Sequence, residues 1–412
     1  MSSQMRHPKL RFIPVNVLLV GSLLFTVSGS RAAEFDQEKL SHDVRAALQK
    51  YVDRDELAGG ITVVGTSKGI VCQEAVGKLN LESGSPLPKD ALFRIASMTK
   101  PITAIGIMQL VEQGKLSVDD PVEKHLPEFK GQMLITEKSG DSVTLKKPSR
   151  PIQIRDLLTH TSGLSSFPAG LQDSYSRRDH TLAEEIMAMS QRPLDFEPGT
   201  KWSYCNAGID TLGRIIEVVS HQRYEDYLAE HVFQPLGMKD TTFYPTPDQM
   251  QRSATLYDRK DGKLVAAGFT LIGAPEHVKN PVPCGGLYST GGDLAKLYQA
   301  MLLKGKLGDQ RILSEDTVAT MTKTQTGDIE TGFTKGMSYG FGFAVVKKPQ
   351  GVTEMLSPGT FGHGGAFGTQ AWIDPQKDVF TILLIQRTGL SNSDESDIRR
   401  DAQIAAYGAI KP

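Results

Sequence analysis

The segment Ser97-Met98-Thr99-Lys100 places a hydroxyl and an amine three residues apart. Side chains at positions i and i+3 share one face of a helix, so the Lys100 amine can reach the Ser97 oxygen. A serine hydroxyl is a poor nucleophile until a neighbouring base takes its proton, and a desolvated lysine can be that base. The pair therefore indicates nucleophilic catalysis, with Ser97 as the nucleophile and Lys100 as a candidate base.

The residues around this pair predict the elements that must position it. Phe93-Arg94-Ile95 is typical of a short strand, and Ser97 is a suitable cap residue for the helix that follows. Pro101 is tolerated in a first helical turn, and the run Ile102 to Leu110 is apolar enough for a buried helix. A serine at such an N-terminus lies beside free backbone N–H groups, which suits a developing oxyanion.

Two further motifs occur once each in the chain. Tyr204-Cys205-Asn206 is its only Tyr-x-Asn, and His363-Gly364-Gly365 is its only His-x-Gly. A Ser-x-x-Lys match alone is weak, because a capped helix with a solvated lysine produces the same letters. Three unique matches in this order and at this wide spacing are much harder to obtain by chance.

The order of these motifs matches that of the penicillin-recognising serine hydrolases, and the chain resembles the serine beta-lactamase-related family, which holds class C beta-lactamases, D-alanyl-D-alanine carboxypeptidases and beta-lactamase-like (family VIII) carboxylesterases. The likeness runs from about Val63 to about Gln386 and includes the stretches 157–164, 198–200 and 285–290. It implies a mixed α/β fold of the beta-lactamase/transpeptidase-like type. In that fold an antiparallel sheet flanked by terminal helices carries a mostly helical insertion, and the active site lies in the cleft between the two parts.

The resemblance also implies a role for each motif residue. Ser97 would be the acylated nucleophile, while Lys100 and Tyr204 would share proton transfer; which of the two is the base stays open. Asn206 would hold a substrate carbonyl or amide. The backbone N–H groups of Ser97 and Ala366 would form the oxyanion hole.

The third motif, with His363 and Gly365 as its substrate-binding residues, departs from the lactamase pattern. Beta-lactamases carry a lysine where this chain has His363, and that lysine attracts the carboxylate beside the lactam ring. A neutral imidazole offers a hydrogen bond but no full charge. The replacement favours less charged substrates such as esters. The alternative is a histidine that merely packs within a strand.

Other reactive-looking residues have simpler interpretations. Gly65 to Gly69 matches Gly-x-Ser-x-Gly, but the β-forming runs on both sides predict that Ser67 lies in a hairpin turn rather than a nucleophile elbow. We expect His160 to shape a loop rather than serve as a triad base, and Cys205 to be a small semi-buried filler. Trp202 and Tyr288 are compatible with either a cleft wall or core packing.

Residues 1–32 predict a secretory signal. Lys9 and Arg11 form a basic start, the run from Phe12 to Val27 is mostly apolar, and small residues predict cleavage after Ala32. Retention of this run as an uncleaved anchor is the alternative, although it is short for a membrane span. We therefore expect an exported protein, periplasmic or secreted.

Composition limits the partners. The chain has 46 basic and 47 acidic residues, so its charge does not favour nucleic acid or an anionic membrane surface. Three cysteines are an odd number for an exported chain, so at least one is unpaired in a monomer. No metal-ligand spacing or phosphate-binding loop occurs, and we expect no metal and no cofactor.

The pattern of elements predicts one large domain, residues 33–412. Helices are expected at 38–51, 181–189, 209–220 and 396–410, and strands at 339–346, 370–373 and 379–385. Strands near both chain ends imply a single antiparallel sheet flanked by terminal helices, with a sheet part at 33–101 and 284–412 and a helical part at 102–283. Residues 139–147 predict a small hairpin at the cleft rim.

The favoured function is an exported serine hydrolase that cleaves small-molecule esters or small amides through an acyl-enzyme. One alternative is a D-amino-acid peptidase, carboxypeptidase or beta-lactamase acting on peptidoglycan-like substrates. A non-enzymatic alternative is a penicillin-binding receptor that is acylated, or merely binds, without turnover. Multiple turnovers on a chromogenic ester would separate enzyme from receptor.

Overall fold

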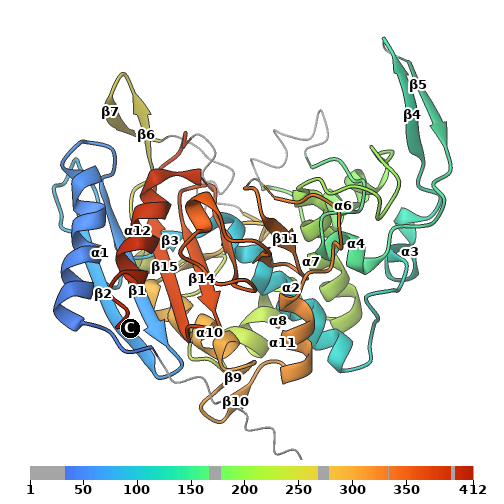
Figure 1. The fold of residues 1–412 in the computed structure, drawn as a ribbon. Helices are drawn as coiled ribbons and strands as arrows, with labels where there is room; N and C mark the ends of the chain where they lie inside the picture. The colour runs from blue at the N-terminus through green and yellow to red at the C-terminus, as the bar shows by residue number, and fades with distance from the viewer. Residues whose placement is uncertain are drawn as a thin grey trace, which may run out of the picture. The chain divides into compact units, whose positions relative to one another are not determined.

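The computed structural model describes residues 33–140, 142–166, 178–267, 278–332, 334–390 and 395–411. Within these ranges, seven strands form one antiparallel sheet in the order β11-β12-β13-β14-β15-β1-β2 (Figure 1). These strands are β1 (Gly59–Thr66), β2 (Gly69–Gly77), β11 (Met337–Tyr339), β12 (Ala344–Val346), β13 (Phe361–Gly364), β14 (Gln370–Asp374) and β15 (Val379–Ile385). The sheet thus joins segments from both ends of the chain, as the sequence predicts.

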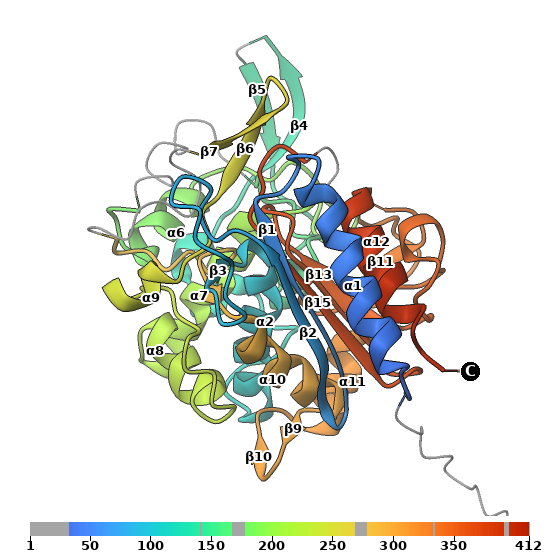
Figure 2. The same cartoon turned by 90° about the vertical axis from the view of Figure 1, so that its left-hand side faces the viewer.

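Helices cover both faces of this sheet. On one face, α1 (Gln37–Val52) and α12 (Asp397–Tyr407) pack against each other, with α1 on β2 and α12 on β15. On the other face lies α10 (Gly291–Leu302), against β1, β14 and β15. Figure 2 shows the strands between these two layers. Double coverage explains why β15 is buried along its whole length and is apolar throughout except at Thr381.

The segment between β2 and β11 is mostly helical and surrounds α2. Its longer helices are α2 (Thr99–Glu112), α6 (Leu182–Ser190), α7 (Asn206–Ser220), α10 and α11 (Glu315–Thr322), and its short ones are α3 (Val122–His125), α4 (Ile154–Leu158), α8 (Tyr224–Leu228) and α9 (Pro247–Gln251). Every side chain of α2 from Thr99 to Leu110 is buried, against α7 and α8 among others. The apolar run from Ile102 therefore forms the buried helix that its sequence predicts.

Four two-stranded ladders complete the described structure. They are β3–β8 (Phe93–Arg94 with Tyr288–Ser289), β4–β5 (Leu134–Ser139 with Ser142–Lys146), β6–β7 (Tyr257–Lys260 with Lys263–Ala266) and β9–β10 (Lys306–Leu307 with Gln310–Arg311). The β4–β5 and β6–β7 hairpins project away from the rest of the fold (Figure 1). The predicted hairpin at 139–147 is thus present, but it begins earlier, at Leu134.

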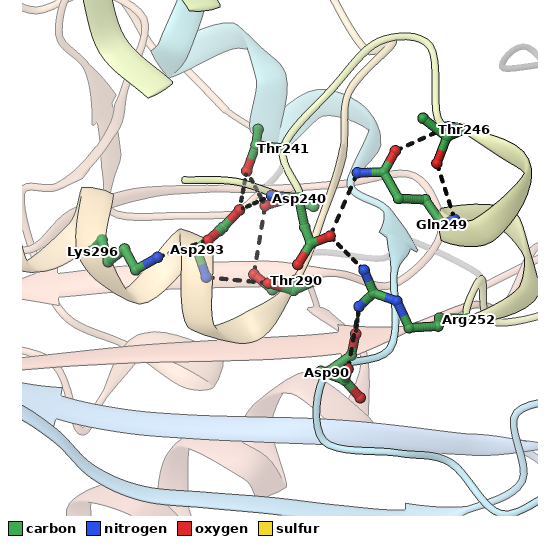
Figure 3. A network of polar contacts seen from close by, with 10 residues as sticks. Asp90, Asp240, Thr241, Thr246, Gln249, Arg252, Thr290, Asp293 and Lys296 are labelled. Carbon is green, nitrogen blue, oxygen red and sulfur yellow. Dashed lines mark hydrogen bonds and ion pairs between the residues drawn. The ribbon is translucent and has the colours of Figure 1, made fainter. Parts of the chain in front are cut away.

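A network of polar contacts connects the chain segments around the β3–β8 ladder to one another (Figure 3). Arg252 donates to the Asp90 carbonyl at 2.6 Å and also pairs with the Asp240 carboxylate. The carboxylate of Asp293, in the first turn of α10, accepts from the Asp240 N–H at 2.7 Å and from Thr241 Oγ at 3.1 Å. Because Asp90 lies just before β3, these bonds tie the strand that leads to Ser97 to α10.

Two predictions about local structure are wrong. The single strand expected at 339–346 is a hairpin of β11 and β12, because Gly340 to Phe343 turn the chain. At Gly342 the backbone has a φ of +78°, and a Cβ there would come within 2.3 Å of Ala104 Cβ on α2, so glycine permits both the turn and the close approach. Ser97 is not a helix cap either, as described below.

The predicted leader, residues 1–32, lies outside the described residues. Among the residues that are described, no helix is both long enough and apolar enough to cross a bilayer.

Candidate active site

Ser97 lies in a 3₁₀ turn, Ala96–Met98, that connects β3 to α2. Met98 is the N-cap of α2 and makes no side-chain capping bond, so the sequence prediction of Ser97 as the cap is wrong. The residue before it, Ala96, has a φ of +48°, in the left-handed region that alanine rarely adopts. Such strain persists only where surrounding structure enforces it, and it is common at reactive residues.

The Lys100 amine faces Ser97. Lys100 Nζ lies 3.0 Å from Ser97 Oγ and donates to the Cys284 carbonyl at 2.8 Å. The side chain is completely buried, and this burial lowers the pKa of Lys100. A lysine with a lowered pKa holds a larger neutral fraction near pH 7, and only the neutral amine can take the serine proton. The i and i+3 spacing thus produces the predicted contact.

A buried carboxyl group lies behind the lysine. Asp210 Oδ1 accepts from the Cys284 N–H at 2.7 Å, so one residue, Cys284, connects Asp210 to Lys100 through its two backbone groups. Burial, and next the nearby Glu185, raise the pKa of Asp210 to about 8. No motif of the sequence marks Asp210; the signal that could have marked it is a charged residue among the buried positions of an amphipathic helix.

The Tyr-x-Asn motif borders the same site. Lys100 Nζ lies 4.7 Å from the centre of the Tyr204 ring, and Asn206 is the first residue of α7. Cys205 between them is buried, and its sulfur caps α7 by accepting from the Gly208 N–H at 3.3 Å. Burial raises the pKa of the Cys205 thiol to about 12, so this thiol is a structural cap rather than a nucleophile.

Two histidines and a tyrosine form a hydrogen-bonded chain beside Tyr204. His160 Nδ1 accepts from the Cys205 N–H at 3.1 Å, and His160 Nε2 lies 3.2 Å from the Tyr339 hydroxyl. That hydroxyl lies 2.9 Å from His363 Nε2, while His363 Nδ1 lies 2.6 Å from the Gly364 carbonyl. The chain therefore links the loop of His160 to the third motif.

The two ends of this chain fix its proton positions. A carbonyl can only accept, so His363 Nδ1 carries a hydrogen; because burial lowers the pKa of this ring and keeps it neutral, Nε2 carries none and accepts from Tyr339. An amide N–H can only donate, so His160 Nε2 carries the hydrogen and donates to Tyr339. Both imidazoles are then neutral. Burial, with the Lys100 charge next, lowers the pKa of His363 to about 3 and that of His160 well below 6.5.

The turn after β13 holds the two remaining motif residues. Gly365 N–H donates to the Thr369 carbonyl at 2.7 Å and Gly368 N–H to the Gly365 carbonyl at 3.0 Å, which leaves Ala366 exposed at the tip. A Cβ on Gly365 would lie 2.4 Å from the Ile95 carbonyl oxygen, so glycine lets this turn touch the segment that precedes Ser97. Among the described residues, neither the Ser97 N–H nor the Ala366 N–H donates to a backbone carbonyl.

A cavity borders the second and third motifs, and its lining does not include Ser97 or Lys100. Tyr204, Tyr339 and His363 line it, together with the half-buried Trp202 and the buried Trp372. Trp202 thus belongs to the cavity wall. Tyr288, the other aromatic residue considered from the sequence, is buried in β8 beneath Arg94 and does not line this cavity.

The remaining reactive residues lie in other surroundings. Ser67 occupies the turn between the antiparallel strands β1 and β2, and its hydroxyl donates to Asp378 at 2.7 Å, which confirms the hairpin interpretation. Cys72, Cys205 and Cys284 are all buried. Within the part of the chain that the structure describes, no group of three or more acidic, histidine or cysteine side chains is arranged to hold a metal ion.

Comparison with known proteins agrees with this geometry. The family described as Beta-lactamase matches residues 44–406. The chain belongs to the beta-lactamase family. Esterase EstB of Burkholderia gladioli is 29% identical over 86% of this chain and 92% of that protein. The Salmonella agona protein named "Putative D-alanyl-D-alanine carboxypeptidase" is 28% identical over 88% of this chain and 86% of that protein.

A solved structure extends the likeness to the fold. EstCE1, a hydrolase with promiscuous acyltransferase activity, superposes with a TM-score of 0.74 at 26% identity, covering 90% of this chain and 99% of that one. The antiparallel sheet between helical layers is therefore the beta-lactamase/transpeptidase-like fold, as the resemblance implies. This member of the beta-lactamase family is a serine hydrolase.

Proposed function

We propose that the protein is a carboxylesterase that hydrolyses small neutral esters through an acyl-enzyme on Ser97. The observation that carries the proposal is the 3.0 Å separation between Ser97 Oγ and the buried Lys100 amine. A base at this distance, with its pKa lowered by burial, meets the geometric and electrostatic requirements for activating a serine. Relatives that are esterases add support.

In the proposed reaction, neutral Lys100 takes the Ser97 proton as Oγ attacks the ester carbonyl carbon. The Ser97 and Ala366 amides stabilise the resulting oxyanion. When the tetrahedral intermediate collapses, the C–O bond to the alcohol breaks, and the alcohol leaves with a proton that Lys100 and Tyr204 return. Water then attacks the acyl-serine carbonyl in the same manner, and the acid is released with Ser97 restored.

The state of His363 supports neutral substrates. Its two ring nitrogens already bond to Tyr339 and to the Gly364 carbonyl, and its pKa lies far below neutral pH. The residue thus presents no positive charge to a substrate carboxylate at this position. Hydrogen bonds to charged partners are worth roughly 1.5–3 kcal/mol against about 1 for neutral ones. A lactam or D-peptide, both of which carry a carboxylate, would lack that attraction at His363.

A peptidase or lactamase acting on peptidoglycan-like substrates is the second candidate. It is favoured by the similarity to the Salmonella protein, which covers most of both chains. The two candidates differ in the charge of the group beside the scissile bond. The preference between neutral and carboxylate-bearing substrates can therefore separate the esterase from the peptidase or lactamase.

A substrate panel on the purified protein tests the proposal. We expect multiple turnovers on a short p-nitrophenyl ester and kcat/KM values far lower for a cephalosporin and a D-Ala-D-Ala peptide. A stoichiometric burst without turnover would instead indicate a penicillin-binding receptor. A fluorophosphonate probe should label the peptide that contains Ser97. Ser97→Ala should abolish labelling and turnover, while Ser67→Ala, the matched control in the hairpin turn, should retain both.

We further infer that residues 1–32 direct export, on the basis of their basic start and apolar run. Intact-mass measurement of the protein expressed in its own type of host should find a mature chain that begins at Ala33. A chain that retains Met1 would contradict cleavage.

A further inference from the structure

Arg399, on the terminal helix α12, is completely buried beneath the turn that follows β13. One guanidinium nitrogen donates to the Gly365 carbonyl at 2.8 Å and to the Thr369 carbonyl at 2.7 Å, and Nε reaches the Gly368 carbonyl at 3.3 Å. Three carbonyls of one five-residue turn therefore converge on a single side chain. The guanidinium serves them together because its donors lie on two separate nitrogens in one rigid plane.

Thr369 connects the same turn to the nucleophile. Its hydroxyl donates to the Ile95 carbonyl at 3.1 Å, and its own carbonyl accepts from the Gly365 N–H at 2.7 Å. Ile95 lies two residues before Ser97, and the Met98 N–H bonds back to its carbonyl at 3.2 Å. The Thr369 hydroxyl thus bonds directly to the segment that holds Ser97 in its strained turn.

The distance between the turn at residues 365–369 and the segment that holds Ser97 sets the geometry of the proposed oxyanion hole. One amide of the hole belongs to Ser97, and the other belongs to Ala366 at the exposed tip of the turn. Preorganised donors stabilise an oxyanion because they need no reorganisation during the reaction, so a shift of a few tenths of an ångström reduces their effect. Because Ala366 itself is exposed, its position depends on the packing and the bonds of the other residues of the turn: Phe367 belongs to the hydrophobic cluster that includes Ala96, and the carbonyls of Gly365, Gly368 and Thr369 bond to Arg399.

We infer that Arg399 and Thr369 are positioning residues that fix the Ala366 amide relative to the Ser97 amide, and so set the rate of acyl transfer. This inference rests on the proposed function. Charge-assisted bonds from a buried guanidinium are stronger than neutral ones, which suits a clamp on an exposed turn. Neither residue touches the substrate, and both act through the backbone.

The Thr369→Val and Thr369→Ser pair tests the inference with little change in volume. Valine places a methyl group where the hydroxyl stood, and a carbon–oxygen contact needs about 3.3 Å or more, so the turn must move away from Ile95. Serine keeps the donor. We expect kcat for a p-nitrophenyl ester to fall roughly ten- to a hundredfold in the valine variant, with KM within about twofold, and serine to restore most of the rate.

Arg399→Lys keeps the charge, but its single nitrogen cannot occupy both the Nη2 and the Nε positions from which arginine donates, and we expect the same kcat loss. Arg387→Lys is the matched control: the guanidinium of buried Arg387 donates to the Glu56 carbonyl at 2.9 Å, and only its backbone N–H, which the substitution keeps, bonds to the turn, at Phe367. If Arg399→Lys does not fold, as judged by circular dichroism, the Thr369 pair decides alone.

An aryl boronic acid provides the decisive readout, because its tetrahedral adduct on Ser97 places an oxygen in the oxyanion hole. Rates are normalised to sites titrated with a fluorophosphonate, which removes any effect of partial unfolding. We expect the boronate inhibition constant to rise by about the same factor as kcat falls in Thr369→Val. An unchanged rate per titrated site, with an unchanged boronate constant, would overturn the inference. A wild-type protein that is not labelled at Ser97 would instead refute the proposed function.

Discussion

The Tyr339 hydroxyl lies 2.9 Å from His363 Nε2, and this contact joins the two histidines into one hydrogen-bonded chain from the Cys205 N–H to the Gly364 carbonyl. Tyr339 donates to one histidine and accepts from the other, so neither imidazole needs to be charged. As a result, the His363 ring of the third motif is neutral, and both of its nitrogens already have hydrogen-bond partners.

Removing this hydroxyl with Tyr339→Phe should release His363 Nε2. The hydrogen bond that the Tyr339 hydroxyl donates to Nε2 stabilises the neutral form of His363. Loss of this bond should therefore raise the pKa of His363 above about 3. In nitrogen-15 NMR we expect the Nε2 resonance to move toward that of a free pyridine-like nitrogen. The ester kcat/KM should fall roughly two- to tenfold, the scale of one neutral hydrogen bond. An unmoved Nε2 resonance would contradict the assigned direction of the chain.

Lys100 and Tyr204 should act as one unit, because the Lys100 amine lies 4.7 Å from the Tyr204 ring centre, beside Ser97. Lys100→Ala and Tyr204→Phe should each lower kcat by roughly two to four decades, the scale of general acid–base catalysis. The double variant should be little slower than the poorer single one. Tyr288→Phe, in a buried tyrosine outside the cavity, is the control. Near-wild-type turnover of folded Tyr204→Phe would remove tyrosine from the mechanism.

Asp210 should make stability depend on pH. Its folded pKa, about 8, lies above its unfolded value of 3.8, so between these values the folded state holds a proton that the unfolded state releases. Stability from this group is therefore present below about pH 4 and is lost as the pH rises to about 8. Asparagine can still accept from the Cys284 N–H but does not titrate. We expect Asp210→Asn to gain melting temperature relative to the wild type as the pH rises from 4 to 8, in paired calorimetric scans. A constant difference would contradict the raised pKa.

The sequence predicts the contacts that arise within one turn of chain, and it misses those made by tertiary structure. The spacing of Ser97 and Lys100 is enough to predict their approach, since helix geometry alone brings i and i+3 together. The contact between Tyr339 and His160, by contrast, joins residues 179 positions apart. No local pattern encodes it, because it exists only once the loops and the sheet are assembled.

Arg399 is only partly predictable from the sequence, because its burial follows from a local pattern but its hydrogen-bond partners do not. It occupies the helix face that also carries Ala402, Gln403 and Ala406, all of which are buried. A helical period applied to residues 397–407 would have placed an arginine on the buried face, and a buried arginine demands acceptors. Its acceptors, three carbonyls of the turn after β13, could not be found in the same way, because backbone carbonyls leave no mark in the sequence.

The charge at position 363 should control the choice between neutral and anionic substrates. His363→Lys places an ammonium beside the Tyr339 oxygen, which can accept from it. The ratio of kcat/KM for a cephalosporin to that for a neutral ester should then rise roughly fivefold. This factor corresponds to about 1 kcal/mol, the value of a partly solvated charge contact. A ratio is needed because the substitution also disturbs β13 and lowers all rates. His363→Gln, which adds no charge, should leave the ratio near that of the wild type.

The pH dependence of kcat/KM in His363→Lys tests whether the new positive charge acts on the active site. We expect activity to fall at low pH as Lys100 becomes protonated, and a second cation nearby disfavours that protonation. The acidic limb of the kcat/KM profile for the neutral ester should therefore move to lower pH in His363→Lys but not in His363→Gln. If the limb moves while the substrate ratio stays constant, or shifts toward esters, position 363 does not set charge preference, and the argument for neutral esters loses its main physical support.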